Sequence, residues 1–421
     1  MRGGTVYKQP RMWDSAYAAW VRAEQRENQV TLELYGDAPA PLIAHEAAEL
    51  ELTFGNRISV LRDGRETLPA IFSAIRAARH FVHLEYYVVE NVHSEGQSLR
   101  DLLVERSQAG VQIALIFDAL GSSGTSSSFF EELRRHGLQM LSFNPINCLK
   151  AHLPYSPNCR DHRKILIADG RLAIVGGINL MAAYEDKPVQ APRPWRDTDL
   201  QLEGPAVEQL QRLFLQHWYA HGGEPLDDRQ FHPPSVRPGQ ESVGIIGSAH
   251  SGTGLQYYGA LLAALGAAKH RVWITAGYFL PPSDLLLELV QAARRKVDVR
   301  LLLPSHNDSF ASLAVQRSTY TRLLQAGIKI FERNTVILHS KSIIIDRSWS
   351  AVGSSNLDYR SAYLNDEVDA IVVGTETAAK LGQLFLSDLS QSDEIVLELW
   401  RRRPFWQKLQ EAFWRVCQRL L

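Results

Sequence analysis

Helix-like and strand-like patterns of apolar residues alternate along most of this chain, and their order occurs twice. Apolar residues recur at helical spacing over 68–80 and lead into an apolar, strand-like run at 81–89. A second helical pattern at 258–270 leads into a strand-like run at 271–280, 190 positions later in the sequence. Helices that alternate with apolar strands predict an α/β fold with a largely parallel, mixed sheet.

The repeat extends beyond the first helix and strand of each half. Further strand-like runs follow at 111–117 and 297–303. We therefore predict two pseudo-symmetric α/β/α lobes with the functional site at their interface. The predicted parts are an extension at 1–51, a first lobe at 52–235, a second lobe at 236–392 and a basic amphipathic helix at 393–421.

Composition is that of a globular protein with enough apolar residues for two cores. The 421 residues are 45% hydrophobic and 22% charged, and 45 basic residues balance 46 acidic ones to give a net charge of −1. A general nucleic-acid coat needs a basic surplus, so this balance argues against one, although it leaves room for a local basic patch.

Cysteines and apolar runs bear on the compartment. Three cysteines without a C-x-x-C pair predict a reducing compartment rather than a disulfide framework, although a Cys148–Cys159 bridge remains open. The first ten residues lack a signal-peptide core, and no run of eighteen apolar residues occurs. We therefore expect no secretion by that route and no membrane span.

Two copies of one short motif carry the candidate chemistry. Each copy reads His-x-Lys-x-x-x-x-Asp and runs into a β-prone segment, and an asparagine follows each histidine by 17 positions. The motif residues are His162, Lys164, Asp169 and the later Asn179 in the first copy, and His339, Lys341, Asp346 and the later Asn356 in the second.

The spacing within the motif predicts a phosphate site. Alternate residues of a strand share a face, so each histidine and its lysine point the same way. Lysine and asparagine balance oxyanion charge, while a histidine attacks phosphorus or transfers a proton. Asp169 and Asp346 complete the catalytic motif, but their odd spacing predicts structural partners at the strand end. A lone His-x-Lys is usually a surface feature, whereas two copies with matched asparagines favour catalysis at one phosphorus.

Two further acidic residues occupy equivalent places after the motifs. Asp197 and Glu367 both stand seven positions before a glycine. A carboxylate that returns to a catalytic histidine holds its tautomer and stabilises the imidazolium, and surface acids at strand ends are the alternative interpretation. We assign Asp197, Glu367, Asn179, Asn356 and Ser354 to the phosphate-binding and supporting set.

Three segments outside the repeat have two interpretations each. Residues 144–160 contain an insertion of about 13 residues in the first lobe, and this insertion either lines a lipid entrance or forms a surface excursion. Trp13, Tyr17 and Trp20 suit a helix that packs on a lobe or touches a membrane. The tail at 400–421 has six basic residues beside an apolar arc, which is typical of a membrane-surface anchor, with a docking helix as the alternative.

The duplicated motif resembles that of the phospholipase D superfamily. Over about residues 55–390, other segments resemble its bacterial cardiolipin synthase branch, in a short form without the N-terminal transmembrane helices of common members. These segments are Glu85-Tyr86-Tyr87, Phe117-Asp118, Gly176-Gly177-Ile178-Asn179, Leu202-Glu203-Gly204, Gly277-Tyr278-Phe279-Leu280-Pro281 and Ser354-Ser355-Asn356-Leu357-Asp358-Tyr359-Arg360-Ser361.

This resemblance implies a phosphatidyl transfer through a phosphohistidine, without cofactor or metal. His162 is then the nucleophile and His339 the acid and base, although the pseudo-symmetry leaves their order open. The implied substrate is a phospholipid, phosphatidylglycerol first, which is joined to a second phospholipid or alcohol. The implied location is peripheral, at the anionic cytoplasmic face of the bacterial inner membrane.

Three other functions stay open at this point. A phospholipase D hydrolase would use the same site with water as acceptor, and only access to the site would differ. A nuclease of the superfamily is disfavoured by the net charge, so no nucleic-acid partner is expected. A non-catalytic membrane scaffold is disfavoured by intact His and Lys residues in both copies. The sequence makes no prediction of the oligomeric state.

Overall fold

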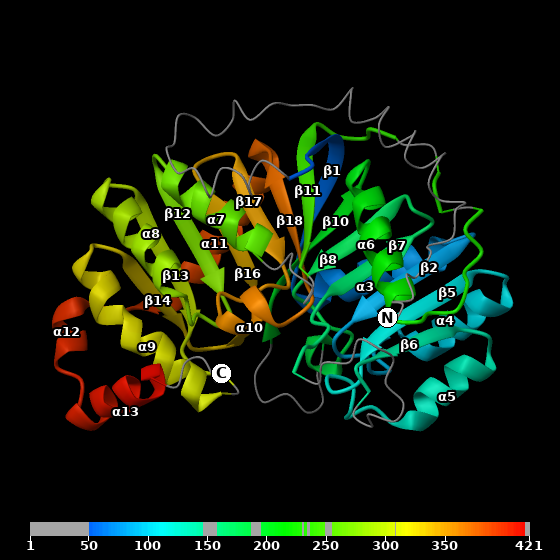
Figure 1. The fold of residues 1–421 in the computed structure, drawn as a ribbon, viewed down its shortest axis with the longest axis horizontal. Coiled ribbons are helices and arrows are strands. Elements are labelled where there is room, and N and C mark those ends of the chain that lie inside the picture. The colour runs from blue at the N-terminus through cyan, green and yellow to red at the C-terminus, as the bar shows by residue number, and fades with distance from the viewer. Residues whose placement is uncertain are drawn as a thin grey trace, which may run out of the picture. The chain divides into compact units, whose positions relative to one another are not determined.

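One mixed sheet of fifteen strands runs through both halves of the repeat (Figure 1). The structure is a computed structural model that describes residues 50–145, 158–186, 195–229, 231–233, 236–248, 255–307 and 309–416. All of these lie in one compact unit, Ala38–Leu421. The predictions for the N-terminal aromatic residues, for Cys148 and most of the insertion, and for Cys417 lie outside the described residues.

Apart from one additional edge strand in the second lobe, the order of equivalent strands is the same from either edge toward the centre. The first lobe contributes β6 (Gln139–Phe143), β5 (Gln112–Asp118), β2 (Phe81–Tyr86), β7 (Lys164–Ala168), β8 (Leu172–Gly176), β10 (Thr198–Glu203) and β1 (Thr53–Arg62). The second lobe continues with β11 (Glu241–Ser248), β18 (Glu367–Val373), β17 (Trp349–Gly353), β16 (Lys341–Ile345), β12 (Arg271–Ala276), β13 (Asp298–Pro304), β14 (Lys329–Arg333) and β19 (Ser392–Glu394). Antiparallel pairing of β1 with β11 joins the lobes at the centre.

The two-lobe α/β fold with a mixed sheet is confirmed, but the predicted predominance of parallel pairing is wrong. Within the described part of this sheet, parallel pairs join only β2, β5 and β6 in the first lobe and β12, β13 and β14 in the second. The other strand pairs of this sheet are antiparallel. The reason is the short connection after each motif strand: three residues separate β7 from β8 and β16 from β17, which suffices for a hairpin but not for a crossover.

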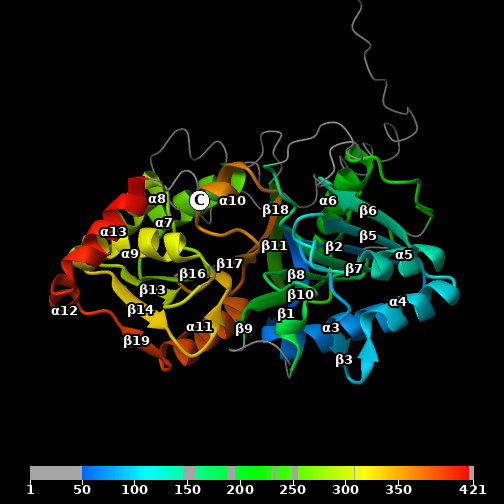
Figure 2. The ribbon, with the colours of Figure 1, turned by 90° about the horizontal axis from the view of Figure 1, so that it is seen from below.

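Helices cover both faces of the sheet. The longer ones before the C-terminal segment are α3 (Asp63–Ala77), α4 (Leu99–Gln108), α5 (Ser127–Arg135), α6 (Ala206–Ala220), α7 (Leu255–Ala267), α8 (Ser283–Arg294), α9 (Phe310–Gln325) and α11 (Thr375–Leu389). Figure 2 shows α6 and α7 on one face and α3 and α11 on the other. The helices predicted at 68–80 and 258–270 are α3 and α7, which begin and end earlier than predicted.

The apolar core is continuous across the centre of the sheet. Its buried side chains include Leu200 and Val175 of the first lobe together with Val352 and Val372 of the second. Because the lobes share this core, they are expected to hold the site residues of both halves in a fixed relation.

The C-terminal segment forms two helices that pack on α9, where the sequence pattern predicts one amphipathic helix. They are α12 (Leu397–Arg401) and α13 (Phe405–Val416). Trp400 packs its ring 5.1 Å from that of Tyr320 in α9, and Arg415 donates to Ser318 of the same helix. Within the described ranges, no helix is both long and apolar enough to cross a bilayer.

Candidate active site

Two short backbone pairings bring each motif beside the other lobe. Residue 161 bridges 366 in parallel, and the His162 N–H donates to the Asp366 carbonyl at 2.8 Å. On the opposite side, β9 (Trp195–Arg196) pairs with β15 (Ile337–Leu338), and the His339 N–H donates to the Arg196 carbonyl at 2.9 Å. Each motif histidine therefore lies next to the residue that precedes a carboxylate of the other lobe.

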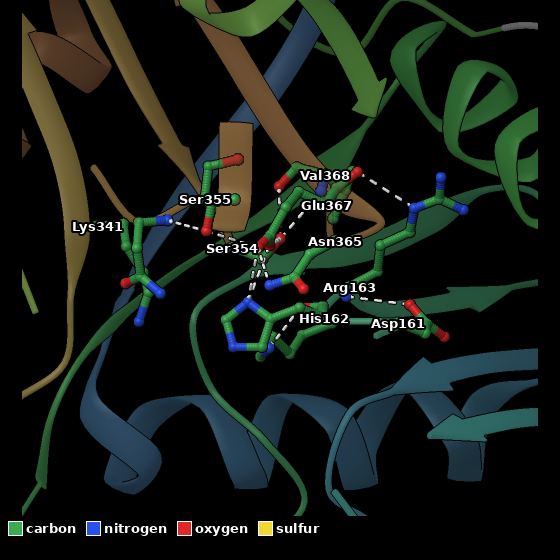
Figure 3. A network of polar contacts seen from close by, with 12 residues as sticks. Asp161, His162, Arg163, Lys341, Ser354, Ser355, Asn365, Glu367 and Val368 are labelled. Atoms are coloured by element: carbon green, nitrogen blue, oxygen red, sulfur yellow. Dashed lines mark hydrogen bonds and ion pairs between the residues drawn. The ribbon is translucent and has the colours of Figure 1, made fainter. Parts of the chain in front are cut away.

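The two histidines are bound by carboxylates from opposite lobes. His162 Nδ1 lies 2.9 Å and 3.1 Å from the two carboxylate oxygens of Glu367 (Figure 3). His339 Nδ1 lies 2.7 Å from Oδ2 of Asp197. Both carboxylates are buried, which excludes the interpretation as surface acids. With Nδ1 facing a carboxylate, each ring keeps Nε2 for attack on phosphorus or for proton transfer.

Burial and neighbouring charges set the protonation states. Burial, together with the ammonium of Lys341, lowers the pKa of His339 to about 4, although Asp197 opposes the shift. Burial also lowers the pKa of His162 against the opposing effect of Glu367. Burial alone would raise the pKa of Asp197, but Lys341 and His339 hold it well below its ordinary value. At neutral pH the histidines are therefore neutral, as a nucleophile must be, and Asp197 is ionised.

The motif lysines lie beside their own histidines, as strand alternation predicts. Lys164 Nζ donates to the His162 carbonyl, and Lys341 Nζ donates to the His339 carbonyl. Lys341 Nζ also lies 2.9 Å and 3.0 Å from the ring nitrogens of His339. Burial lowers the pKa of Lys164 to about 7. A phosphodiester anion that enters would favour the charged form of both ammonium groups.

The predicted supporting residues differ in their hydrogen bonds. Ser354 donates to Glu367 Oε2 at 2.5 Å, so it orients a carboxylate. Asn179 accepts the Val88 N–H through Oδ1 at 3.2 Å, and its amide NH2 group carries two donors. Asn356 is buried, and its Oδ1 has no hydrogen-bond partner among the described residues.

The motif aspartates belong to the strand ends and not to the histidine cluster. Asp169 follows the last residue of β7 and accepts the N–H groups of residues 79–81 at 2.8–2.9 Å. Asp346 accepts those of residues 269–271 in the same way. They fix the turn between a helix and a parallel strand in each lobe. These contacts agree with the interpretation of Asp169 and Asp346 as structural partners. We therefore remove both residues from the predicted catalytic set.

A second pair of buried carboxylates was not singled out from the sequence. Asp199 accepts the Ile178 N–H at 3.1 Å, and Asp369 accepts the Ser355 hydroxyl at 2.5 Å. Both hold the turn that carries a motif asparagine. A Cβ at Gly176 or Gly353 would lie 2.1 Å from the respective aspartate oxygen, so only glycine fits there. The sequence did contain a signal for this pair, because Asp199 and Asp369 each follow a predicted carboxylate, Asp197 or Glu367, by two positions.

Behind His162 lies a buried cluster of charged groups that the sequence did not reveal. Arg163 donates to Glu85 at 3.2 Å, and His217 Nδ1 lies 2.8 Å from the same oxygen. Glu85, Asp161 and His217 hold one potential ligand atom each within 4.8 Å of one another. The Arg163 guanidinium already neutralises Glu85, so we interpret the group as an ion-pair network and not as a metal centre.

Comparisons with known proteins agree on one family. A family model described as "Cardiolipin synthase, PLD-like domain" matches residues 71–218 and 261–389. Cardiolipin synthases of Alkalihalophilus pseudofirmus and Geobacillus kaustophilus are each 36% identical to this chain, over 90% and 91% of it and over 75% and 76% of their own length. The solved phosphatidylserine synthase of Haemophilus influenzae is 13% identical and superposes over 90% of this chain and 100% of its own, with a TM-score of 0.67. That last likeness shows the fold alone.

Proposed function

Because the chain belongs to the cardiolipin synthase family of phospholipase D-like proteins, we propose that it is a phosphatidyltransferase that makes cardiolipin from phosphatidylglycerol. The observation that carries this proposal is the pair of buried histidines, each bound through Nδ1 to a carboxylate of the other lobe. Two lysine ammonium groups beside them supply positive charge for the phosphate oxygens.

The reaction needs two displacements at one phosphorus. In the first, neutral His162 Nε2 forms the N–P bond while the bond from phosphorus to the head-group glycerol oxygen breaks. His339 must enter this step as the imidazolium, which the bound phosphodiester anion favours, and it donates the proton that the departing oxygen takes up. In the second, His339 removes the proton of the acceptor hydroxyl, whose oxygen bonds to phosphorus as the N–P bond breaks. Asp197 and Glu367 stabilise each imidazolium as it forms. The resemblance assigns the order of the two histidines, and the reverse order uses the same contacts.

Product analysis tests the proposal. Purified protein is incubated with vesicles that contain phosphatidylglycerol labelled in its acyl chains, with and without EDTA. We expect labelled cardiolipin and free glycerol, at a rate that EDTA leaves nearly unchanged because lysines take the place of a divalent ion. Phosphatidic acid as the sole product would show a hydrolase instead. Loss of activity in EDTA that Mg²⁺ restores would overturn the metal-free mechanism.

The tail helix supports a second part of the proposal, attachment to an anionic membrane surface. Apolar side chains of α13 point into solvent: the exposed fractions are 69% for Phe405, 72% for Trp406 and 60% for Phe413. Glu411 is the buried residue of this helix and pairs with Arg403 at 2.7 Å. Arg401, Arg402, Lys408 and Arg415 are also exposed. The helix contacts α9, as through Arg415 and Ser318, and leaves an apolar, basic face outward, which suits an anionic bilayer.

Substitution of the exposed face tests the attachment without removing the packing contacts. In the triple variant Phe405→Ser, Trp406→Ser, Phe413→Ser, we expect affinity for vesicles rich in phosphatidylglycerol to fall about tenfold or more, since each side chain loses its burial in lipid. Cleavage of a soluble short-chain substrate stays at the wild-type rate. The control replaces two exposed leucines of other helices, Leu287→Ser and Leu386→Ser. Unchanged vesicle binding by the triple variant would contradict this role of the tail.

A further inference from the structure

Five positions after each motif asparagine, a hydroxyl donates to the carboxylate that binds a motif histidine. Tyr184 OH donates to Asp197 Oδ2 at 2.8 Å. Ser361 Oγ donates to Glu367 Oε1, also at 2.8 Å. The two hydroxyls therefore stand at the same place in the repeat, although one is carried by tyrosine and the other by serine. Neither residue is among the site residues predicted from the sequence.

The backbone around each hydroxyl explains how it reaches the carboxylate. Tyr184 ends the short 3-10 helix η2 (Ala182–Tyr184), and Ser361 lies in α10 (Tyr359–Tyr363). Both side chains are buried, so water does not compete for these hydrogen bonds. Asp358 caps α10 by accepting the Ser361 N–H at 2.8 Å, which fixes the serine.

The two carboxylates differ in the side chains that donate hydrogen bonds to them. Oδ2 of Asp197 receives Tyr184 and His339, while the Thr198 N–H occupies Oδ1 at 2.8 Å. Glu367, in contrast, also accepts from Ser354 and from Asn365. Tyr184 OH lies 3.2 Å from His339 Nδ1 as well, so it contacts both members of its pair. Loss of Tyr184 therefore removes a larger share of the support than loss of Ser361.

We infer that Tyr184 and Ser361 are positioning residues for phosphatidyl transfer: each fixes the carboxylate of its own lobe and, through it, the histidine of the other lobe. The inference rests on the proposed function. A carboxylate held by a hydroxyl cannot rotate away from Nδ1, so the ring keeps its proton there and presents Nε2 to phosphorus. Tyr184 acts on His339 in this way, and Ser361 acts on His162.

Kinetics of full-length variants provide the first test. We expect Tyr184→Phe to lower kcat about tenfold or more and Ser361→Ala to lower it about threefold, because each removes a hydrogen bond to a charged carboxylate that acts in the catalytic step. The KM for phosphatidylglycerol should stay within twofold of the wild-type value. Ser361→Thr keeps the hydroxyl and should restore most of the rate. The controls are the exposed residues Tyr219→Phe and Ser390→Ala, with wild-type kcat expected.

Nitrogen-15 spectra of histidine-labelled protein provide a test that needs no turnover. In Tyr184→Phe the His339 resonances should move from Nδ1–H values toward averaged tautomer values while those of His162 stay, and Ser361→Ala should do the reverse. Spectra unchanged in both variants, or both histidines altered in each, would overturn the inference. Should the wild-type protein form no cardiolipin from phosphatidylglycerol, the proposed function fails instead, and the spectra still decide the positioning role.

Discussion

His162→Ala and His339→Ala are each expected to lower phosphatidyl transfer by about a hundredfold or more in a protein that remains folded. Each substitution removes one of the two groups that must act on opposite sides of phosphorus, so the remaining histidine cannot complete the displacement. It also leaves Glu367 or Asp197 without its imidazole partner. The measurement is the initial rate of cardiolipin formation, with the fold checked by circular dichroism.

The repeat offers a matched pair of control histidines. His80 and His270 are exposed and hold equivalent places before β2 and β12. Their alanine variants should keep the wild-type rate. If a folded His162→Ala or His339→Ala protein retains more than about a tenth of that rate, the two motifs do not share one phosphorus.

Arg163→Met is expected to produce the largest loss of stability, about 3–5 kcal/mol of unfolding free energy. Arg163 is 2% exposed and donates to Glu85, to the Ser248 carbonyl at 2.7 Å and to the Glu367 carbonyl at 3.2 Å. Methionine fills a similar volume but leaves these acceptors buried without the charge that satisfied them. Because one acceptor is the backbone of Glu367, transfer activity should fall as well.

An exposed ion pair of the same residue types gives the control. Arg57 donates to Glu203 at 3.2 Å on the surface, so Arg57→Met should cost no more than about 1 kcal/mol. Urea denaturation of the three proteins measures the difference. A similar stability of Arg163→Met and wild type would show that the buried network contributes little.

The same network predicts how stability depends on pH. Although burial lowers it, the Glu85 carboxylate and Asp366 raise the pKa of His217 to about 10, above its ordinary value of 6.5. A histidine whose pKa is raised on folding stabilises the protein fully below its unfolded pKa. That contribution is lost as the pH rises toward 10.

The sequence was sufficient for the features that depend on neighbours along the chain. Periodicity of apolar residues predicted the alternating helices and strands, and the repeat predicted the two lobes. Strand alternation predicted that each motif histidine and lysine lie side by side, and the odd spacing of Asp169 and Asp346 predicted their place at the strand ends. The helical, amphipathic tail followed from its 3.6-residue pattern. These properties are local, so a few adjacent residues determine them.

Only the tertiary structure decided which carboxylate serves which histidine. Glu367 lies 205 positions from His162, and Asp197 lies 142 positions from His339, and each pair forms across the lobes. This crossing depends on two short backbone pairings, of residue 161 with 366 and of β9 with β15, whose residues give no periodic signal. The roles of Tyr184 and Arg163 depend on the same packing. Contacts between distant residues are set by how the shared core brings the lobes together, and no pattern confined to one segment contains that information.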